Sequence, residues 1–424
     1  MPLQEMEQLQ GDLLRQTVDY AAAASPYYRE RLSATYGYAA SVKSLSDLRA
    51  LPLTTREDIQ GRNGDFQAAA ADHVVEIVAT TGTTGAPIIV PMTAGDVERL
   101  AEGERRGLQW LGARPGDRFH VAVTLDNLFV AGLAYQAGLH RLGAAAIRVG
   151  AQPSRRHLDL IRELRPDGMV AVPSHLLALA RQAEIEAVDL KEFAPMKFLL
   201  IGEATRERDM SPNRLGRLVS EAWSGTMHST YGLTEAGLAF HECPARQGVH
   251  AHPDLVLCEI VDEDGAVLPP GAAGELAITT LQVEGMPLLR YRTGDITFLL
   301  SGRCPCGRNG PRLGPVLGRK QQRMKFKGTT LYPKVFEEAL LSVDGVDNFL
   351  VEVHHGEGEW DRVVVRVGTS RDDPCFKKRL SDILYSKARV TPEVCLESPF
   401  ALERLIFDGG RRKPRTFIDF RDRG

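Results

Sequence analysis

Between residues 74 and 230 the chain alternates between short apolar runs typical of strands and longer amphipathic runs typical of helices. This alternation restricts the fold more than any other feature, because strands that alternate with helices pack as a parallel sheet covered by helices. The predicted strands are 74–79, 88–90, 119–123, 144–149, 168–172, 198–201 and 226–230. The predicted helices are 94–111, 128–142, 155–164 and a helix that ends near Glu184 and has Ser174 as its N-cap. We therefore expect a layered α/β domain with a largely parallel sheet.

The regions on either side of this alternation have different patterns. Residues 1–60 are predicted to be helical, with a break at Ser25-Pro26. Residues 255–300 carry short strands, the last over 296–299, joined by turns rich in glycine and proline, which predicts a small antiparallel β unit. A new βαββα pattern begins after residue 318, and 424 residues exceed the usual size of one core. We predict a large multi-layer α/β domain with a small β subdomain over residues 1–318, and a small α+β domain over residues 319–424.

The composition argues against several classes of partner. The net charge of −3 gives no electrostatic reason to expect nucleic acid. No apolar run approaches the roughly 18–20 residues of a membrane span, so no membrane partner is expected. The first residues are polar and acidic, unlike a secretory signal, and we expect a cytoplasmic protein. Assembly into a homodimer is left as an open alternative.

A segment dense in hydroxyl groups and glycine lies between the first two predicted strands. It reads Thr80, Thr81, Gly82, Thr83, Thr84, Gly85, Ala86, Pro87. Glycine lets backbone N–H groups converge and threonine adds hydroxyl donors, a combination that forms a nest for phosphate oxygens. A strand follows the segment, and it lacks the Gly-Lys-Ser/Thr ending, so it is not a Walker loop. The alternative is a polar hairpin turn.

This segment resembles the phosphate-binding signature of the adenylate-forming acyl-CoA synthetase superfamily, and three later segments resemble further motifs of that family in the family's order. These are Tyr231-Gly232-Leu233-Thr234-Glu235, Tyr291-Arg292-Thr293-Gly294-Asp295, and Gly318-Arg319 followed by Lys327-Gly328. The opening Ser25-Pro26-Tyr27-Tyr28 and the chain length are similar to the phenylacetate–CoA ligase branch. The resemblance covers about residues 80–413.

The resemblance implies an ATP site with a role for each matching position. Residues 80–85 would hold the β- and γ-phosphates, Thr234 would contact the α-phosphate, and Glu235 would hold Mg²⁺, which prefers carboxylate and phosphate oxygens. Six residues would surround the nucleoside: Tyr231, Gly202, Glu203 and Ala204 at the adenine, and Asp295 and Arg319 at the ribose. As structural alternatives, Asp295 could be a turn residue and Glu235 a helix cap.

Lys413, near the end of the chain, is the predicted catalytic lysine. The resemblance implies that it bridges the carboxylate and the α-phosphate during adenylation, and that the C-terminal domain then rotates about a hinge after Arg319 for the second step. The alternative is a solvated basic tail. Two departures from the family stand out: Ala86 occupies a position where many relatives have lysine, and Gln321 and Gln322 replace an aspartate at the hinge.

Four residues form a candidate structural zinc site. Cys304-Pro305-Cys306 is a tight turn with two thiols, and Cys243 precedes His250 by seven residues. Three cysteines and one histidine are an ordinary zinc ligand set. His241 and His252 compete as the fourth ligand, and the alternative is a set of unconnected side chains in loops.

The predicted function is therefore an ATP-dependent, AMP-forming ligase that converts a carboxylic acid into an acyl-adenylate and transfers the acyl group to coenzyme A. The acid is expected to be aryl or arylacetic, with Phe129 and Tyr135 as candidate contacts, although each could instead be a core residue. Two other interpretations remain open. One is an adenylating enzyme whose acceptor is a carrier-protein thiol or an amine, and the other is a catalytically silent, zinc-stapled nucleotide-binding protein.

Overall fold

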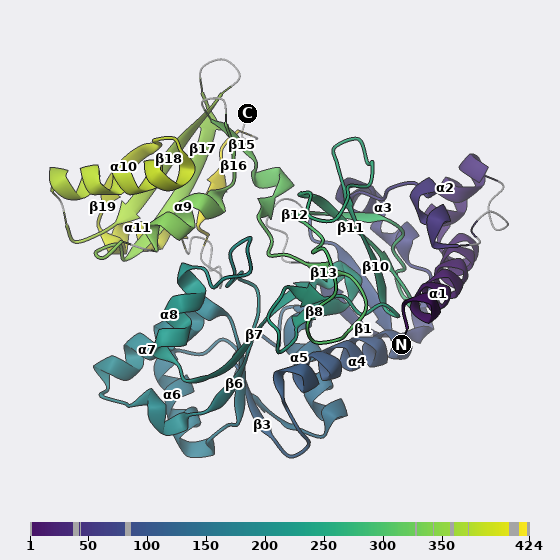
Figure 1. Cartoon of the computed structure of the whole chain (residues 1–424), viewed down its shortest axis with the longest axis horizontal. Helices are drawn as coiled ribbons and strands as arrows, with labels where there is room; N and C mark the ends of the chain where they lie inside the picture. Colours follow the sequence, from purple (N-terminus) through teal and green to yellow (C-terminus); the bar gives the residue numbers. More distant parts are fainter. Residues whose placement is uncertain are drawn as a thin grey trace. The chain divides into compact units, whose positions relative to one another are not determined.

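The computed structural model describes residues 2–36, 42, 44–80, 86–326, 329–341, 343–356, 360–371, 373–406 and 415–421. The chain divides into two compact units, a first unit of residues 1–315 and a second unit of residues 316–424 (Figure 1). Each unit encloses its own buried apolar clusters, as an independently packed domain requires.

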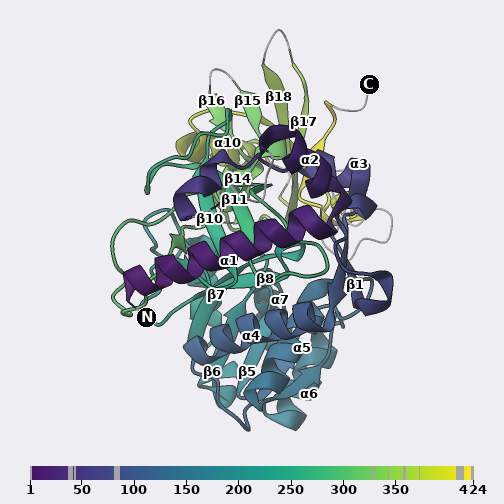
Figure 2. The ribbon, with the colours of Figure 1, turned by 90° about the vertical axis from the view of Figure 1, so that its right-hand side faces the viewer.

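The first unit begins with two helices, α1 (Leu3–Ala24) and α2 (Pro26–Tyr36). The predicted break at Ser25-Pro26 is confirmed, because α1 ends immediately before these two residues. α1 lies across the outside of the unit (Figure 2), and Leu14 and Val18 on its inner face belong to the same apolar cluster as Leu257 of strand β10 (Val256–Val261). Within the described part of the chain, no helix is both long and apolar enough to cross a bilayer.

Thr54 joins the N-terminal region to the rest of the first unit, and it lies two residues before helix α3 (Arg56–Phe66). The backbone of Thr54 forms a parallel bridge with Tyr291: the Thr54 carbonyl accepts from the Arg292 N–H at 2.8 Å. Thr55 then caps α3 in a reciprocal pair with Asp58, whose carboxylate accepts from the Thr55 N–H at 2.8 Å. The capping box fixes the first turn of α3, so that Arg56 is its first residue.

The glycine-rich segment connects two antiparallel strands, β1 (Val74–Ala79) and β2 (Ile89–Thr93). The prediction of a strand on each side of this segment is therefore confirmed, while residues 81–85 lie outside the described residues. Thr93 caps the next helix, α4 (Ala94–Leu111), in a second capping box with Asp96.

The main sheet has the strand order β13-β9-β8-β7-β6-β5-β3-β4. Its parallel part confirms the predicted parallel layer and consists of β4 (Ala145–Arg148), β3 (Arg118–Val121), β5 (Gly168–Ala171), β6 (Met196–Leu200) and β7 (Gly225–Leu233). The antiparallel part consists of β8 (Leu238–Glu242), β9 (Val249–His250) and β13 (Arg312–Leu313). β7 belongs to both parts, because its second half, which carries the Tyr231 motif, pairs with β8.

Helices cover both faces of the parallel strands (Figure 1). Met169 of β5 points into a cluster with α6 (Ser154–Leu164), α7 (Pro173–Ile185) and α8 (Arg214–Ala222). The next residue, Val170, points into a cluster with α4 and α5 (Val130–Leu142). Successive side chains of a strand face opposite sides, so a fully apolar strand such as β5 needs this double cover.

A second, antiparallel sheet contains β10, β11 (Gly274–Thr280) and β12 (Tyr291–Thr297) as consecutive strands. The antiparallel prediction for this region is confirmed, but the predicted range of 296–299 for the last strand is wrong, because β12 starts at Tyr291. The register with β11 shifts between Glu275 and Ala277, and this bulge accommodates Gly294 at φ +78°. Polar residues therefore lie within a strand that the apolar pattern did not reveal.

The second unit contains a four-stranded sheet in the order β19-β18-β17-β20. Its strands are β17 (Asn348–His355), β18 (Asp361–Gly368), β19 (Glu393–Glu397) and β20 (Phe417–Asp419), and its helices are α9 (Pro333–Leu340), α10 (Pro374–Ala388) and α11 (Pro399–Ile406). A separate hairpin is formed by β15 (Met324–Phe326) and β16 (Thr329–Leu331). The predicted βαββα order is present as β16, α9, β17, β18 and α10. It has β15 and the short strand β14 (Gly318–Arg319) before it and β19, α11 and β20 after it. The two units together confirm the predicted α/β fold class.

Two buried imidazoles and a half-buried third lie together beside β3. His120 Nε2 lies 2.8 Å from His157 Nδ1 of α6, and the His157 ring centroid lies 4.7 Å from that of His175 of α7. Burial, with the neighbouring imidazoles, lowers the pKa of His120 to about 3, and burial lowers the pKa of His157 to about 4. Both imidazoles are therefore neutral in the folded protein at pH 7.

We expect the free energy of unfolding to fall as the pH drops from about 6.5 towards 4. In that range the unfolded chain protonates these histidines while the folded chain does not, at a cost of about 2 kcal/mol per imidazole at pH 5. Replacing His120 with glutamine should reduce the difference in unfolding free energy between pH 7 and pH 5 by about this amount. Urea unfolding at each pH, followed by tryptophan fluorescence, measures this difference in unfolding free energy. The exposed His140, changed to glutamine, serves as control, and an equal pH dependence in all three proteins would contradict the assignment.

Candidate active site

Thr80, the first residue of the glycine-rich segment, is hydrogen-bonded to Ile88, which directly follows the segment. Its N–H donates to the Ile88 carbonyl at 3.0 Å, and its Oγ1 accepts from the Ile88 N–H at 2.9 Å. Thr80 therefore pairs the two ends of the segment through backbone and side chain together. The predicted phosphate contacts of Thr81, Gly82, Thr83, Thr84 and Gly85 concern positions outside the described residues and stay predictions.

Arg56, the first residue of α3, connects the glycine-rich segment with the second motif. Its Nη2 donates to Thr80 Oγ1 at 3.2 Å, and its Nη1 donates to Glu235 Oε1 at 3.1 Å. Tyr291, the first residue of the third motif, donates its hydroxyl to the same Glu235 oxygen at 3.0 Å. The structure therefore brings the first residue of the segment, the predicted magnesium ligand and the third motif together.

Glu235 is held in one orientation by these two donors. It lies in a single 3₁₀ turn, η5 (Thr234–Ala236), directly after β7, and its side chain is only 4% exposed. Both donors act on Oε1, and no bond from a described residue falls on Oε2. Burial and the nearby Glu235 raise the pKa of Tyr291, which keeps this phenol a hydrogen-bond donor. A carboxylate with one oxygen fixed and the other available suits a magnesium ligand.

The second and third motifs also meet at Tyr231. Its hydroxyl donates to Asp295 Oδ2 at 2.8 Å, and Asp295 is 5% exposed. Burial, together with the Asp295 charge, raises the pKa of Tyr231 well above its usual value, so the phenol stays protonated. Asp295 lies within β12, so the alternative of a simple turn residue does not describe it. Its predicted role at the ribose stays a prediction.

Glu203, in the turn after β6, caps helix α7. Its carboxylate accepts from the Ser174 N–H and from Ser174 Oγ, both at 2.8 Å. The prediction of Ser174 as N-cap is wrong, because Val172 is the cap residue and Pro173 is the first helical residue. Val172 has no side-chain acceptor, and Glu203 supplies one from the adjacent strand end. Gly202 has φ +76°, which gives this turn the backbone conformation that glycine tolerates.

Several predicted site residues cannot be assigned to this cluster. Lys413 lies outside the described residues. Arg319 lies in the second unit, in the short strand β14 (Gly318–Arg319), where it is exposed. Thr234 begins the η5 turn and is half-buried, and Ala204 accepts a hydrogen bond from Asn213 Nδ2 through its carbonyl. The predicted roles of these residues stay predictions.

The four predicted zinc ligands converge within the first unit. The antiparallel pairing of β9 with β13 places His250 opposite Arg312, next to the loop that carries Cys304 and Cys306. The ligand atoms of Cys243, His250, Cys304 and Cys306 all lie within 4.8 Å of one another. His241 instead lies 2.9 Å from Glu104 Oε2, with His252 Nε2 3.4 Å from its other ring nitrogen, so the structure favours His250 as the fourth ligand.

The spacing of these atoms fits a zinc ion. A tetrahedral site with Zn–S bonds of about 2.3 Å and Zn–N bonds of about 2.0 Å separates two sulfurs by about 3.8 Å and sulfur from nitrogen by about 3.5 Å. Cys243 Sγ and Cys304 Sγ are 3.6 Å apart, and Cys306 Sγ and His250 Nε2 are 3.5 Å apart. Burial lowers the pKa of His250 to about 4, so the imidazole is in the neutral form that binds metal. Zinc itself stays a prediction.

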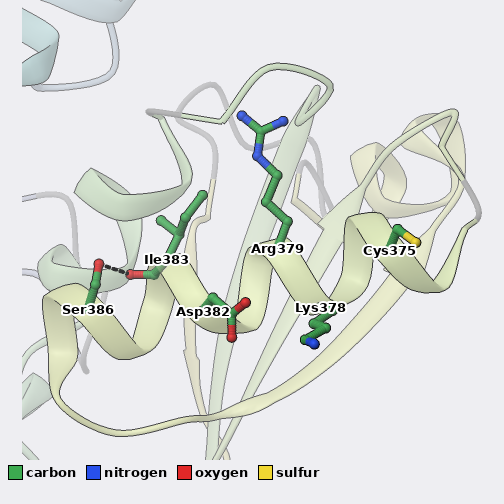
Figure 3. A pocket seen from close by; sticks show the side chains of 6 residues that line it. All are labelled: Cys375, Lys378, Arg379, Asp382, Ile383 and Ser386. Carbon is green, nitrogen blue, oxygen red and sulfur yellow. Dashed lines mark hydrogen bonds between the residues drawn. The ribbon is translucent and has the colours of Figure 1, made fainter.

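The two aromatic candidates for the acid pocket differ in burial. Tyr135 is 3% exposed and belongs to the apolar cluster between α4, α5 and the sheet, which favours its alternative role as a core residue. Phe129, which precedes α5, is half-buried and packs against the same cluster. A shallow depression elsewhere, along α10 in the second unit (Figure 3), is lined by none of the predicted site residues.

Sequence patterns did not reveal Arg56 as a site residue. Its neighbours Thr55 and Asp58 have the spacing of a capping box, which predicts a helix start but no contact. Arg56 and Glu235 are 179 residues apart in the chain, so only the folded structure shows their bond.

Comparisons with known proteins show which family this chain resembles. Residues 22–285 match the family described as AMP-binding enzyme. The chain is 32% identical to a phenylacetate–coenzyme A ligase of Thermus thermophilus, over 91% of this chain and 85% of that protein. It is 30% identical to one of Escherichia coli, over 86% of this chain and 82% of that protein.

A solved structure shares the fold. A crystal structure described as 2-hydroxyisobutyryl-CoA ligase in the postadenylation state, in complex with 2-HIB-AMP, superposes with a TM-score of 0.85 at 22% identity, over 100% of this chain and 91% of that one. With a family match over more than half of its length and relatives at 30% identity or above, the chain belongs to the AMP-binding enzyme family.

Proposed function

We propose that this protein is an ATP-dependent, AMP-forming ligase that joins a carboxylic acid to coenzyme A. In the first step a carboxylate oxygen attacks the α-phosphorus of ATP and pyrophosphate leaves. In the second step the thiol attacks the acyl carbon and AMP leaves. The relatives named phenylacetate–coenzyme A ligase support this reaction, and they also support an aryl or arylacetic acid as substrate.

One observation carries the proposal: Arg56 bonds both Thr80 and Glu235, and Tyr291 bonds the same Glu235 oxygen. Three motifs with ATP-binding roles in the resembled family thus share one cluster in this chain. Glu235 would hold Mg²⁺ through Oε2, and the bound ion would supply positive charge to the phosphates. Asp295, which is held in place by the hydrogen bond that it accepts from Tyr231, would accept hydrogen bonds from the ribose hydroxyls.

We further propose that residues 1–318 form the adenylation domain and that residues 319–424 form a mobile domain that brings Lys413 to the reaction. Arg319 would support the ribose region next to the hinge. The zinc site would be structural, because three thiols and one imidazole fill all four positions of a tetrahedron and leave none for a substrate.

Replacing Lys413 with alanine should separate the two steps. The rate of adenylate formation should fall by about 10²- to 10³-fold, because a charge that acts in the first transition state is lost. The rate of thioester formation from a synthetic acyl-adenylate and coenzyme A should change less than about threefold. Single-turnover assays of each step measure this, and an equal loss in both steps would contradict a role confined to adenylation.

ATP–pyrophosphate exchange over a panel of aryl, arylacetic and short aliphatic acids tests the proposed function. Exchange with an acid of the panel, followed by AMP release that depends on coenzyme A, is the expected result. Exchange without stimulation by coenzyme A would instead favour a carrier-protein or amine acceptor. ATP binding without exchange for any acid would favour a catalytically silent nucleotide-binding protein.

A further inference from the structure

The glycine-rich segment of this chain contains no cation of its own. From Thr80 to Pro87 the sequence has neither lysine nor arginine, and Ala86 occupies the position where the family resemblance places lysine. A triphosphate carries several negative charges, and neutral hydroxyl and N–H donors bind phosphate more weakly than charged donors do. If the protein binds ATP, a charge from elsewhere in the fold is needed beside this segment.

Helix α3 brings such a charge to the segment. Arg56 donates to Thr80 at the start of the segment, and Gln60, one turn later, donates through Nε2 to the carbonyl of Ala86 at its end. Residues four apart lie on the same side of a helix, so one side of α3 contacts both ends of the segment. The Thr55–Asp58 capping box fixes the turn from which Arg56 extends.

The guanidinium has capacity for a further acceptor. Arg56 Nε is buried, and among the described residues it has no hydrogen-bond partner. The side chain is 18% exposed, so it is neither sealed in the core nor free in solvent. An unpaired buried N–H costs about 1–3 kcal/mol, and a bound anion would remove that cost.

We propose that Arg56 is a phosphate-binding residue, which supplies at the terminal phosphates of ATP the positive charge that Ala86 lacks. This inference rests on the proposed function, because it names a residue of the same nucleotide site. Arg56 also keeps Thr80 and Glu235 together. A guanidinium suits both tasks, because its planar fork presents several donors at once.

Isothermal titration with MgATP and with AMP tests this role. Arg56→Ala should weaken MgATP binding by about 10- to 100-fold, the effect of losing charge-assisted hydrogen bonds. AMP binding should change less than about threefold, since AMP lacks the terminal phosphates, and it also serves as the folding control. The MgATP affinity of Arg56→Lys should fall between that of the wild-type protein and that of Arg56→Ala. Arg62→Ala, which removes a surface arginine of the same helix paired with Glu30 and Asp65, should change neither affinity.

A relocated charge gives the sharper test. In the double variant Arg56→Ala/Ala86→Lys, the new lysine should recover about tenfold of the lost MgATP affinity, which a purely structural arginine would not allow. Equal losses of AMP and MgATP affinity, or no recovery, would overturn the inference while the proposed function stands. If the wild-type protein bound no MgATP, the proposed function and this inference would both fail.

Discussion

Replacing Glu235 with glutamine should lower the rate of ATP–pyrophosphate exchange by about 10²- to 10³-fold. Glutamine preserves the size of the side chain, and its oxygen can still accept from Arg56 and Tyr291, so the local structure should persist. It lacks the negative charge that attracts a divalent cation, so the substitution removes the predicted magnesium ligand and also the negative partner of Arg56. Exchange rates measured over a range of Mg²⁺ concentrations test this expectation.

The dependence on Mg²⁺ separates metal binding from simple positioning. A weakened metal ligand should raise the Mg²⁺ concentration needed for half-maximal exchange by about tenfold or more. Glu57→Gln is a matched control, because Glu57 is exposed on α3 directly after Arg56. A loss of activity that is the same at every Mg²⁺ concentration would show that Glu235 only positions its neighbours.

Replacing Cys304 with serine should remove the bound metal and destabilise the first unit by several kcal/mol, because the free energy of binding a structural metal contributes to folding. Wild-type protein should contain about one equivalent of zinc and the variant almost none, measured by elemental analysis, with calorimetry reporting the shift in melting temperature. Cys375→Ser, at an exposed position of α10 outside the cluster, should change neither quantity.

Activity provides a second criterion for the zinc site. Because all four ligands come from the protein, the metal should be structural, and the Cys304→Ser variant that remains folded at low temperature should keep its exchange rate within about threefold. Wild-type protein with less than about half an equivalent of zinc after mild purification would contradict the site. A loss of exchange without any loss of stability would contradict its structural role.

The sequence predicted the parts of the fold whose physical cause is local. Hydrophobic periodicity located α4, and the apolar run of β5 indicated a strand covered on both faces. Prediction from the sequence failed at β12, where the register shift at Glu275 lets a polar segment lie in a strand. It also failed at Ser174, because the cap of that helix comes from Glu203 at the end of another strand.

The candidate site also contains residues that the sequence predicted and contact partners that it did not. Family motifs predicted Glu235 and Asp295 as site residues, and cysteine spacing predicted the four Cys and His side chains that the structure brings together. The contact partners could not be identified, because Arg56 and Tyr291 reach Glu235 only through tertiary packing. No pattern within about ten residues of Arg56 distinguishes it from an ordinary charged residue at the start of a helix.

The backbone bridge between Thr54 and Tyr291 has a practical consequence for anyone who shortens this protein. The region before β1 resembles a peripheral helical attachment, yet it continues directly into a residue paired with the strand that carries Tyr291 and Asp295. A version trimmed to start at β1 would lose both that pairing and Arg56. Nucleotide binding, and not only solubility, should therefore be measured before any such truncation is adopted.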